Sequence, residues 1–166
     1  MKKTQNKHKN RFVFFVLRFF ALIILAFCIT VPVMMVGPRL FDYMPYIVVS
    51  SSMEPTLKTG DVVYVESYSP EGFQNGDLVC FYGNVHNTTP TTHRVVSNDQ
   101  ENHQLITKGD ANQTEDITPV SYSSILGKVV FHTPKIGYVF EGLNSIYGKI
   151  LYVMVLIIGI LLFELS

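Results

Sequence analysis

The sequence is poor in cysteine and lacks the common metal and nucleotide motifs. Only Cys28 and Cys80 occur among 166 residues, so a disulfide framework is excluded. The patterns CxxC and HExxH are absent, and so is a glycine-rich phosphate loop. Metal and nucleotide sites therefore have no support from the motifs.

Charge is scarce and balanced. Lys+Arg and Asp+Glu number 13 each, and charged residues make up 16% of the chain against 48% apolar residues. Without a basic field, nucleic-acid binding has no support either. The length suits one domain of ordinary size, and the apolar residues are concentrated at the two ends of the chain.

The first apolar run predicts a membrane anchor. Residues 19–36 carry no charge, and the run extends back to Phe12 across the single Arg18. A bilayer core of ~30 Å needs ~20 such residues as a helix, so we expect a transmembrane anchor over residues 12–36. A cleavable signal peptide also begins with a basic segment and an apolar run. The exit VMMVGPRLFDY offers no clear small-x-small cleavage site, however, which favours an uncleaved anchor.

The segment before this anchor is basic. Its cationic side chains are Lys2, Lys3, Lys7, Lys9 and Arg11. By the positive-inside rule, residues 1–11 are a cytoplasmic tail and residues 37–145 are extracytoplasmic.

A second apolar run, residues 150–163, lies near the other end. At 14 residues it is short for a span, but residues 146–148 extend it if the amine of Lys149 reaches the interface. We expect residues 146–166 to form a second transmembrane helix. A buried or an interfacial helix is the alternative.

Between the two ends, the pattern is typical of β-structure. Short runs rich in Val, Ile, Tyr and Phe, such as DVVYVESY and LGKVVFHT, are bounded by Gly, Asn, Asp and Pro. No helical pattern of 10–15 residues separates these runs, which argues against βαβ units. The fold is therefore predicted to be mainly β, with an antiparallel domain over residues 37–145 flanked by the two helices.

The stretch SSSMEPT, residues 50–56, ends one such run and contains a candidate nucleophile. Pro55 excludes a regular helix or a central strand, so Ser52 is expected in a turn. A serine hydroxyl attacks well only when a base takes its proton. Ser50, two residues earlier on the same face, could donate to an oxyanion together with a backbone N–H. The alternative is a serine-rich turn without chemistry.

A candidate base occurs in the stretch THRVV. The chain has five histidines: His8, His86, His93, His103 and His132. His8 lies in the basic tail, His86 and His103 lie in polar stretches that resemble loops, and His132 ends a run. Only His93 begins an apolar strand, and an imidazole with an unperturbed pKa of ~6.5 suits a general base. A structural histidine is the alternative.

A third motif, KGDAN, is followed by Glu115 and Asp116. Gly-Asp and Asn at this spacing are typical of a turn. A carboxylate here could instead hold the imidazole of His93 in the required tautomer. Asp110 and Asp116 are both candidates, and their spacing does not choose between them.

The order SxSMxPT, THRVV and KGDxN closely resembles type I signal peptidase, over about residues 39–138. The histidine of THRVV narrows the resemblance to the endoplasmic-reticulum type, which is also found in archaea and some Gram-positive bacteria; the common bacterial type has a lysine there. The resemblance implies that Ser52 is the nucleophile, His93 the general base and Ser50 an oxyanion donor. It matches Asp110 and Asp116 to the two aspartates of the last box, the second being the third catalytic member. Two positions depart from the family pattern: Ala111, where Asn is usual, and Ser51, where Gly is common.

The resemblance also implies an activity: a membrane-bound serine endopeptidase that removes signal peptides from exported preproteins after small residues, at A-x-A-like sites. No metal or cofactor is needed. An extended substrate would pair with the strand edge at Ile47, Val48 and Val49. The expected location is the plasma membrane, or the endoplasmic reticulum membrane in a eukaryote, with the catalytic domain outside the cytoplasm. The expected partners are preproteins and the lipid bilayer, and not nucleic acid.

Two other readings compete with this one. Self-cleaving repressor-type proteases share the fold, but they use a lysine base and lack anchors. A non-catalytic membrane-anchored β-domain that binds partners would keep the anchors and strands. It would not need Ser52, His93 and Asp116 to come together.

Overall fold

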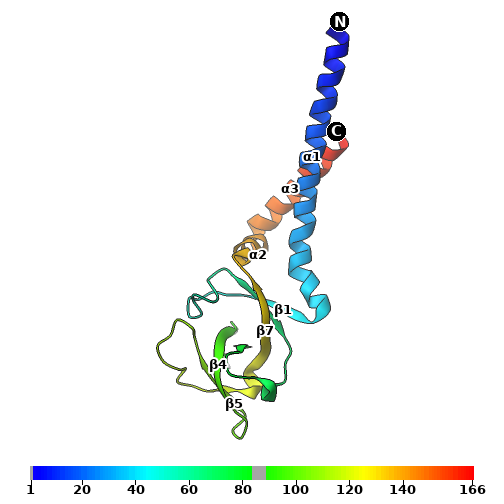
Figure 1. The fold of residues 1–166 in the computed structure, drawn as a ribbon. Coiled ribbons are helices and arrows are strands. Elements are labelled where there is room, and N and C mark those ends of the chain that lie inside the picture. Colours follow the sequence, from blue (N-terminus) through cyan, green and yellow to red (C-terminus); the bar gives the residue numbers. More distant parts are fainter. Residues whose placement is uncertain (1, 84–88) are drawn as a thin grey trace. The chain divides into compact units, whose positions relative to one another are not determined.

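The computed structural model describes residues 2–83 and 89–166, with side chains from Phe12 onward (Figure 1). His86 lies outside the described residues. The chain divides into two compact units. One consists of Met1–Gly37 with Glu141–Ser166, and the other is Pro38–Phe140.

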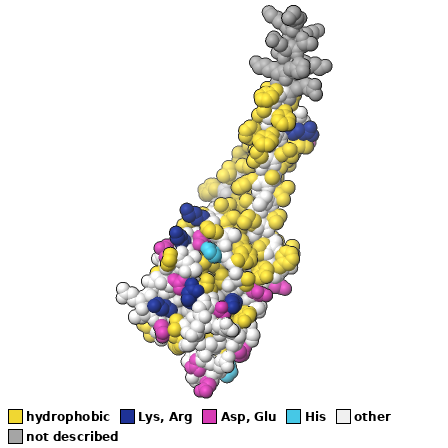
Figure 2. Space-filling model, in the orientation of Figure 1, with side chains coloured by type: hydrophobic (Ala, Val, Ile, Leu, Met, Phe, Trp, Pro, Cys, Tyr) yellow, Lys and Arg dark blue, Asp and Glu magenta, His cyan; other side chains and the backbone are white. Residues whose placement is uncertain are grey.

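The first unit is a pair of long helices, α1 (Lys2–Val36) and α3 (Ile146–Glu164). They lie against each other within this unit (Figure 1). Most of their large apolar side chains point away from the protein, and Figure 2 shows apolar side chains covering the visible face of the helices. By length and composition, Phe12–Phe41 and Ile146–Glu164 are both able to cross a membrane.

The second unit is built on one antiparallel sheet. Seven strands of the described residues join it in the order β1-β2-β7-β3-β4-β5-β6, and their pairings are antiparallel. In chain order the strands are β1 (Tyr43–Ile47), β2 (Val62–Glu66), β3 (Leu78–Phe81), β4 (Thr91–Asp99), β5 (Gln104–Lys108), β6 (Val120–Ser121) and β7 (Ile125–Thr133). The 3₁₀ turn Gly37–Phe41 precedes β1, Pro70–Gly72 lies between β2 and β3, and Tyr122–Ser124 lies between β6 and β7. The predicted fold class, mainly antiparallel β between two apolar helices, is confirmed.

Two apolar clusters hold the sheet together. Burial of β-branched and aromatic side chains on the inner faces of the strands is what stabilises such a sheet. The first cluster consists of Met53, Leu57, Val63, Val65, Cys80 and Val129. The second consists of Phe73, Val79, Phe81, Val95, Leu105 and Val120. β3 contributes to both, so it joins the two halves of the core.

One helix was not expected from the sequence. α2 (Ile136–Asn144) follows β7 and precedes α3. Its first turn packs closely on the segment before β2, since the amide of Gly137 donates to the carbonyl of Gly60 over 2.9 Å. Gly137 also lies so close to this carbonyl and to Ile47 that a Cβ would not fit. At nine residues, this helix is shorter than the helical pattern of 10–15 residues that the sequence lacks.

Candidate active site

Ser52 lies in a tight turn just after β1, where the sequence predicts a turn. Met53 and Leu57, the next apolar side chains, are fully buried in the first cluster. The amide of Leu57 donates to the carbonyl of Met53, and the amide of Ala111 donates to the carbonyl of Ser52 over 2.9 Å. Gly109 permits this approach, since a Cβ there would meet the Ser52 carbonyl oxygen at 2.6 Å. The turn is therefore fixed by burial on one side and by the 109–112 loop on the other.

Three side chains from distant parts of the chain form a line of hydrogen bonds. The Oγ of Ser52 lies 3.3 Å from Nε2 of His93, and Nδ1 of His93 lies 2.5 Å from Oδ2 of Asp116. An ionised carboxylate can only accept, so the neutral ring donates from Nδ1. Its Nε2 is then the acceptor for the Ser52 hydroxyl. This is the tautomer in which a histidine can take a proton from serine.

Strand pairing explains the placement of His93. It is the third residue of β4, opposite Val79 of β3, and the ring is almost fully buried. The ring of Phe81 contacts it edge-on, with the ring centroids 6.1 Å apart. The imidazole is therefore held on the core-facing side of a central strand. Only its two nitrogens remain for polar partners.

Asp116 is positioned by β5. Its amide donates to the carbonyl of Thr107 over 2.8 Å, and the hydroxyl of Thr107 donates back to its Oδ2 over 2.6 Å. Thr107 is completely buried. The same carboxylate oxygen therefore accepts from both His93 and Thr107. Sequence reasoning missed Thr107, although its alternation with Lys108 in β5 would have placed it on an inward face.

Asp110 lies in a different network. Arg94 binds its carboxylate with two hydrogen bonds, from Nε (2.7 Å) and Nη2 (2.6 Å), and Thr56 adds a third over 2.5 Å. The Arg94 guanidinium, with a smaller contribution from Thr56, holds the pKa of Asp110 below its usual value. The pKa of Arg94 is raised, chiefly by the same hydrogen bonds. Because Arg94 also donates to the carbonyl of Gly76, this pair ties the Ser52 turn and the 109–112 loop to the start of β3.

We expect Asp110→Asn to lower stability by about 1–2 kcal/mol, since a partly buried charged hydrogen bond is lost and Arg94 is a third exposed. The lowered pKa sets the pH dependence. The contribution of Asp110 is present above its unfolded-state pKa and is lost as pH falls through its lower folded-state value. Unfolding midpoints in detergent at neutral and acid pH measure both effects. Glu115→Gln, an exposed neighbour, is the matched control. A variant as stable as the wild type at neutral pH would contradict this role.

Two other side chains, a lysine amine and a cysteine thiol, are poorly placed to act at Ser52. Lys108 lies opposite Arg94 in the β4–β5 pairing, so its side chain leaves the sheet on the face opposite to that of His93. Burial raises the pKa of the Cys80 thiol to about 11. That thiol therefore stays protonated near neutral pH, in the core of the protein.

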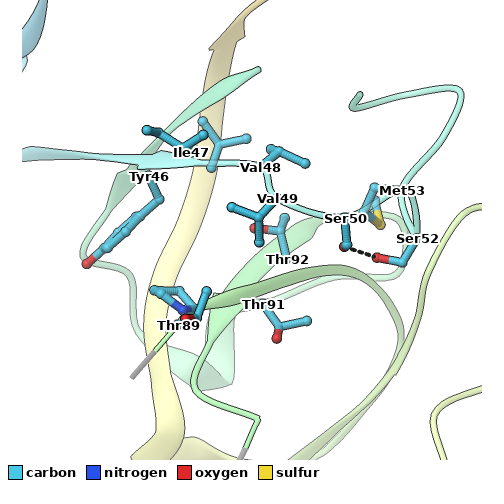
Figure 3. A pocket seen from close by; sticks show the side chains of 12 residues that line it. Tyr46, Ile47, Val48, Val49, Ser50, Ser52, Met53, Thr89, Thr91 and Thr92 are labelled. Atoms are coloured by element: carbon cyan, nitrogen blue, oxygen red, sulfur yellow. Dashed lines mark hydrogen bonds between the residues drawn. The ribbon is translucent and has the colours of Figure 1, made fainter. Parts of the chain in front are cut away.

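A cavity of about 200 Å³ lies beside Ser52 (Figure 3). Figure 3 shows Ser50 and Ser52 joined at its edge by a hydrogen bond, with 3.2 Å between their oxygens. The predicted substrate-binding residues Ile47, Val48 and Val49 line one side. The other lining residues are Tyr46, Met53, Val63, Thr89, Pro90, Thr91 and Thr92. Sequence reasoning missed these, because β4 and the Ser52 turn are brought together only by the folded sheet.

Among the described residues, β1 ends the sheet order, and only one of its edges is paired, with β2. Beyond β1, the amide and carbonyl of Val48 bond to Asp61 and Gly60, over 2.8 Å each. Val49, the next residue, has 63% of its surface exposed. In the part of the chain that the structure describes, the segment from β1 towards Ser52 therefore presents one edge without a strand partner.

Comparison with known proteins gives the family. A sequence model described as "Signal peptidase, peptidase S26" matches residues 16–102, which is half of the chain and includes Ser52 and His93. The chain belongs to this signal peptidase family. This match confirms the prediction, made from the three motifs, that the chain is a type I signal peptidase. Asp110 and Asp116 lie beyond the matched residues.

Curated relatives come from a bacterium and from eukaryotes. "Signal peptidase I W" of Bacillus subtilis is 34% identical over 91 residues, covering 53% of this chain and 47% of that protein. "Signal peptidase complex catalytic subunit SEC11" of Eremothecium gossypii is 36% identical over 105 residues, covering 56% and 61%. The SEC11C subunit of Rattus norvegicus is 26% identical over 123 residues, covering 68% and 63%. The matched region thus spans about half to three-fifths of the length of these relatives.

Proposed function

We propose that this chain is a membrane-bound serine endopeptidase that removes signal peptides from exported preproteins after small residues. The observation that carries the proposal is the line of hydrogen bonds from Ser52 through His93 to Asp116, at the edge of a small cavity. The family match and the names of the relatives support the same reaction.

In the first step, Oγ of Ser52 attacks the carbonyl carbon of the scissile bond while Nε2 of His93 takes its proton. The Nδ1–H of the resulting imidazolium stays bonded to Asp116, whose charge stabilises it. Collapse of the tetrahedral intermediate breaks the C–N bond, and His93 returns the proton to the leaving amine. A water molecule then releases the acyl group from Ser52, with His93 again acting as base.

Ser50 is proposed to donate a hydrogen bond to the oxyanion. The single hydroxyl hydrogen of Ser52 is directed to His93, so the 3.2 Å contact requires Ser50 to donate to Oγ of Ser52. When Oγ becomes bonded to carbon, the Ser50 hydroxyl is free to turn to the developing oxyanion beside it. A backbone N–H of the turn would be the second donor.

The strand edge and the cavity would receive the substrate residues that precede the cut. An extended substrate adds to the open edge near Ile47–Val49 by backbone pairing. Alternate side chains of such a peptide point to the same side, so the residue before the cut and the one two positions earlier both face the protein. Tyr46 and Met53 are among the side chains that line the cavity of about 200 Å³ into which these substrate side chains would point.

Both apolar helices would anchor this enzyme in the bilayer. Their exposed apolar side chains suit lipid, and the basic residues 2–11 place the N-terminal end in the cytoplasm. Residues 37–145 then face the extracytoplasmic side of the plasma membrane, or the lumen of the endoplasmic reticulum in a eukaryote. There they would reach the cleavage site of a preprotein, while the apolar segment of its signal peptide stays in the same bilayer.

A model preprotein with one Ala-x-Ala site tests this function. Membranes that contain the chain should release a product whose new N-terminus, read by mass spectrometry, follows the second alanine. Membranes without the chain provide the blank. Replacing the alanine before the cut by phenylalanine should abolish cleavage, because the proposed enzyme accepts only small residues at this position. Cleavage of both preproteins at equal rates, or no cleavage of either, would refute the proposed specificity or activity.

A further inference from the structure

One face of α1 is packed against α3. From Phe12 onward, where the side chains of α1 are described, the buried residues are Ala21, Cys28 and Val31, spaced by seven and three residues, so they lie on one side of the helix. On α3, Gly159 is buried, and a Cβ built on it would lie 3.0 Å from Ile24. Small residues at the contact let two helices approach closely, as membrane helix pairs require.

The contacts run antiparallel. The guanidinium of Arg18 lies 4.9 Å from the ring centroid of Phe163. Further along α1, Ile24 meets Gly159, and Cys28 meets Tyr152. As residue number rises along α1, it falls along α3. The end of α3 that carries Phe163 therefore lies beside the middle of α1, at Arg18.

A proline creates an unusual polar group on this face. In an α-helix the amide of residue 32 would donate to the carbonyl of residue 28, but Pro32 has no N–H. The carbonyl of Cys28 is thereby deprived of its helical partner in the middle of an apolar segment. The hydroxyl of Tyr152, from α3, donates to this same carbonyl over 2.5 Å. An unpaired carbonyl would be costly in hydrocarbon, where no water replaces the missing donor.

We propose that α3 is a second membrane span and that the hydroxyl of Tyr152 is the clasp that pairs it with α1, by binding the carbonyl that Pro32 leaves free. The inference rests on the proposed membrane location, but not on the proteolytic reaction. It assigns Pro32 a role as well, since the proline makes one carbonyl available at one level of the helix. This hydrogen bond thus fixes which residues of α1 and α3 face each other, because the surrounding contacts are mostly apolar and less directional.

A single labelled carbonyl tests the clasp. Because the chain has only two cysteines, ¹³C-carbonyl cysteine in a Cys80→Ala protein labels Cys28 alone. Tyr152→Phe should move the infrared band of this carbonyl to higher wavenumber, and Tyr147→Phe, an exposed tyrosine of the same helix, should not. Adding Pro32→Ala to Tyr152→Phe should return the band, because the amide of residue 32 now donates. An unmoved band in Tyr152→Phe, or no return in the double variant, would overturn the assignment.

Cross-linking tests the pairing independently. In a protein with Cys28→Ala and Cys80→Ala, a short bis-maleimide should join Arg18→Cys to Phe163→Cys, but not Arg18→Cys to Ile146→Cys at the other end of α3. Tyr152→Phe should shift the equilibrium toward separated helices by roughly 3- to 20-fold, the range of interhelical hydrogen bonds in membranes. Equal yields from the two cysteine pairs would overturn the antiparallel pair. Alkaline carbonate extraction is a separate readout: release of the chain would refute the membrane location, while the infrared result in detergent would still report on the clasp.

Discussion

Ser52→Ala should reduce processing of a model preprotein to the background of the assay. Without the hydroxyl there is no nucleophile for His93 to activate, and loss of the serine in another serine protease costs about 10⁶-fold in kcat. The substituted side chain differs by one oxygen atom, and the turn is held by Met53, Leu57 and backbone hydrogen bonds. The variant should therefore fold and remain in the membrane. Initial rates at equal amounts of anchored protein provide the measurement.

The two neighbouring serines are the controls. Ser51 is exposed and has no side-chain hydrogen bond among those found in the described residues, so Ser51→Ala should change the rate little. Ser50→Ala should reduce kcat by ~10²–10³-fold if its hydroxyl is one oxyanion donor, and by less if water takes its place. The nucleophile would be assigned to the wrong residue if Ser52→Ala kept normal activity, or if Ser51→Ala lost all activity while Ser52→Ala did not.

Asp116→Asn should lower kcat by about 10²–10⁴-fold. One carboxylate oxygen accepts from both Nδ1 of His93 and the hydroxyl of Thr107, and an amide oxygen can take its place. The local structure should therefore survive, while the negative charge that stabilises the imidazolium is lost. The measurement is kcat and KM for the model preprotein, together with the unfolding midpoint.

Asp110→Asn separates a catalytic from a structural aspartate. Its carboxylate binds Arg94 and Thr56 and not the imidazole, so the variant should lose stability while the folded fraction keeps most of its kcat. The reverse pattern, with Asp116→Asn fully active and Asp110→Asn folded but inactive, would exchange the roles of the two aspartates.

Local sequence patterns predicted much of this architecture. The uncharged run 19–36 and the run 150–163 lie in helices, because a long apolar segment hydrogen-bonds its own backbone most simply as a helix. The segment Val62–Val65, which was expected to alternate, forms a strand, but all four of its residues are buried. Tyr64 is buried because its ring stacks on the ring of Phe131. Pro55 marked the turn of Ser52 for a local steric reason.

The choice between Asp110 and Asp116 could not be made from sequence. Both follow β5 within eight residues, and either would satisfy a rule based on spacing. The difference arises from long-range contacts. Arg94 binds the carboxylate of Asp110. The amide of Asp116 donates to the carbonyl of Thr107, and this places the Asp116 carboxylate beside His93. The cavity was hidden for the same reason, since its walls come from β1, the Ser52 turn and the start of β4.

The pH dependence of kcat/KM for the model preprotein shows which side chain is the general base. A neutral imidazole must accept the proton of Ser52, so activity should fall in acid as the imidazole becomes protonated. His93→Ala should be inactive at every pH, whereas Lys108→Ala should keep both the rate and the midpoint. A midpoint near that of lysine, ~10, together with an active His93→Ala and an inactive but folded Lys108→Ala, would contradict the account and indicate a serine–lysine pair.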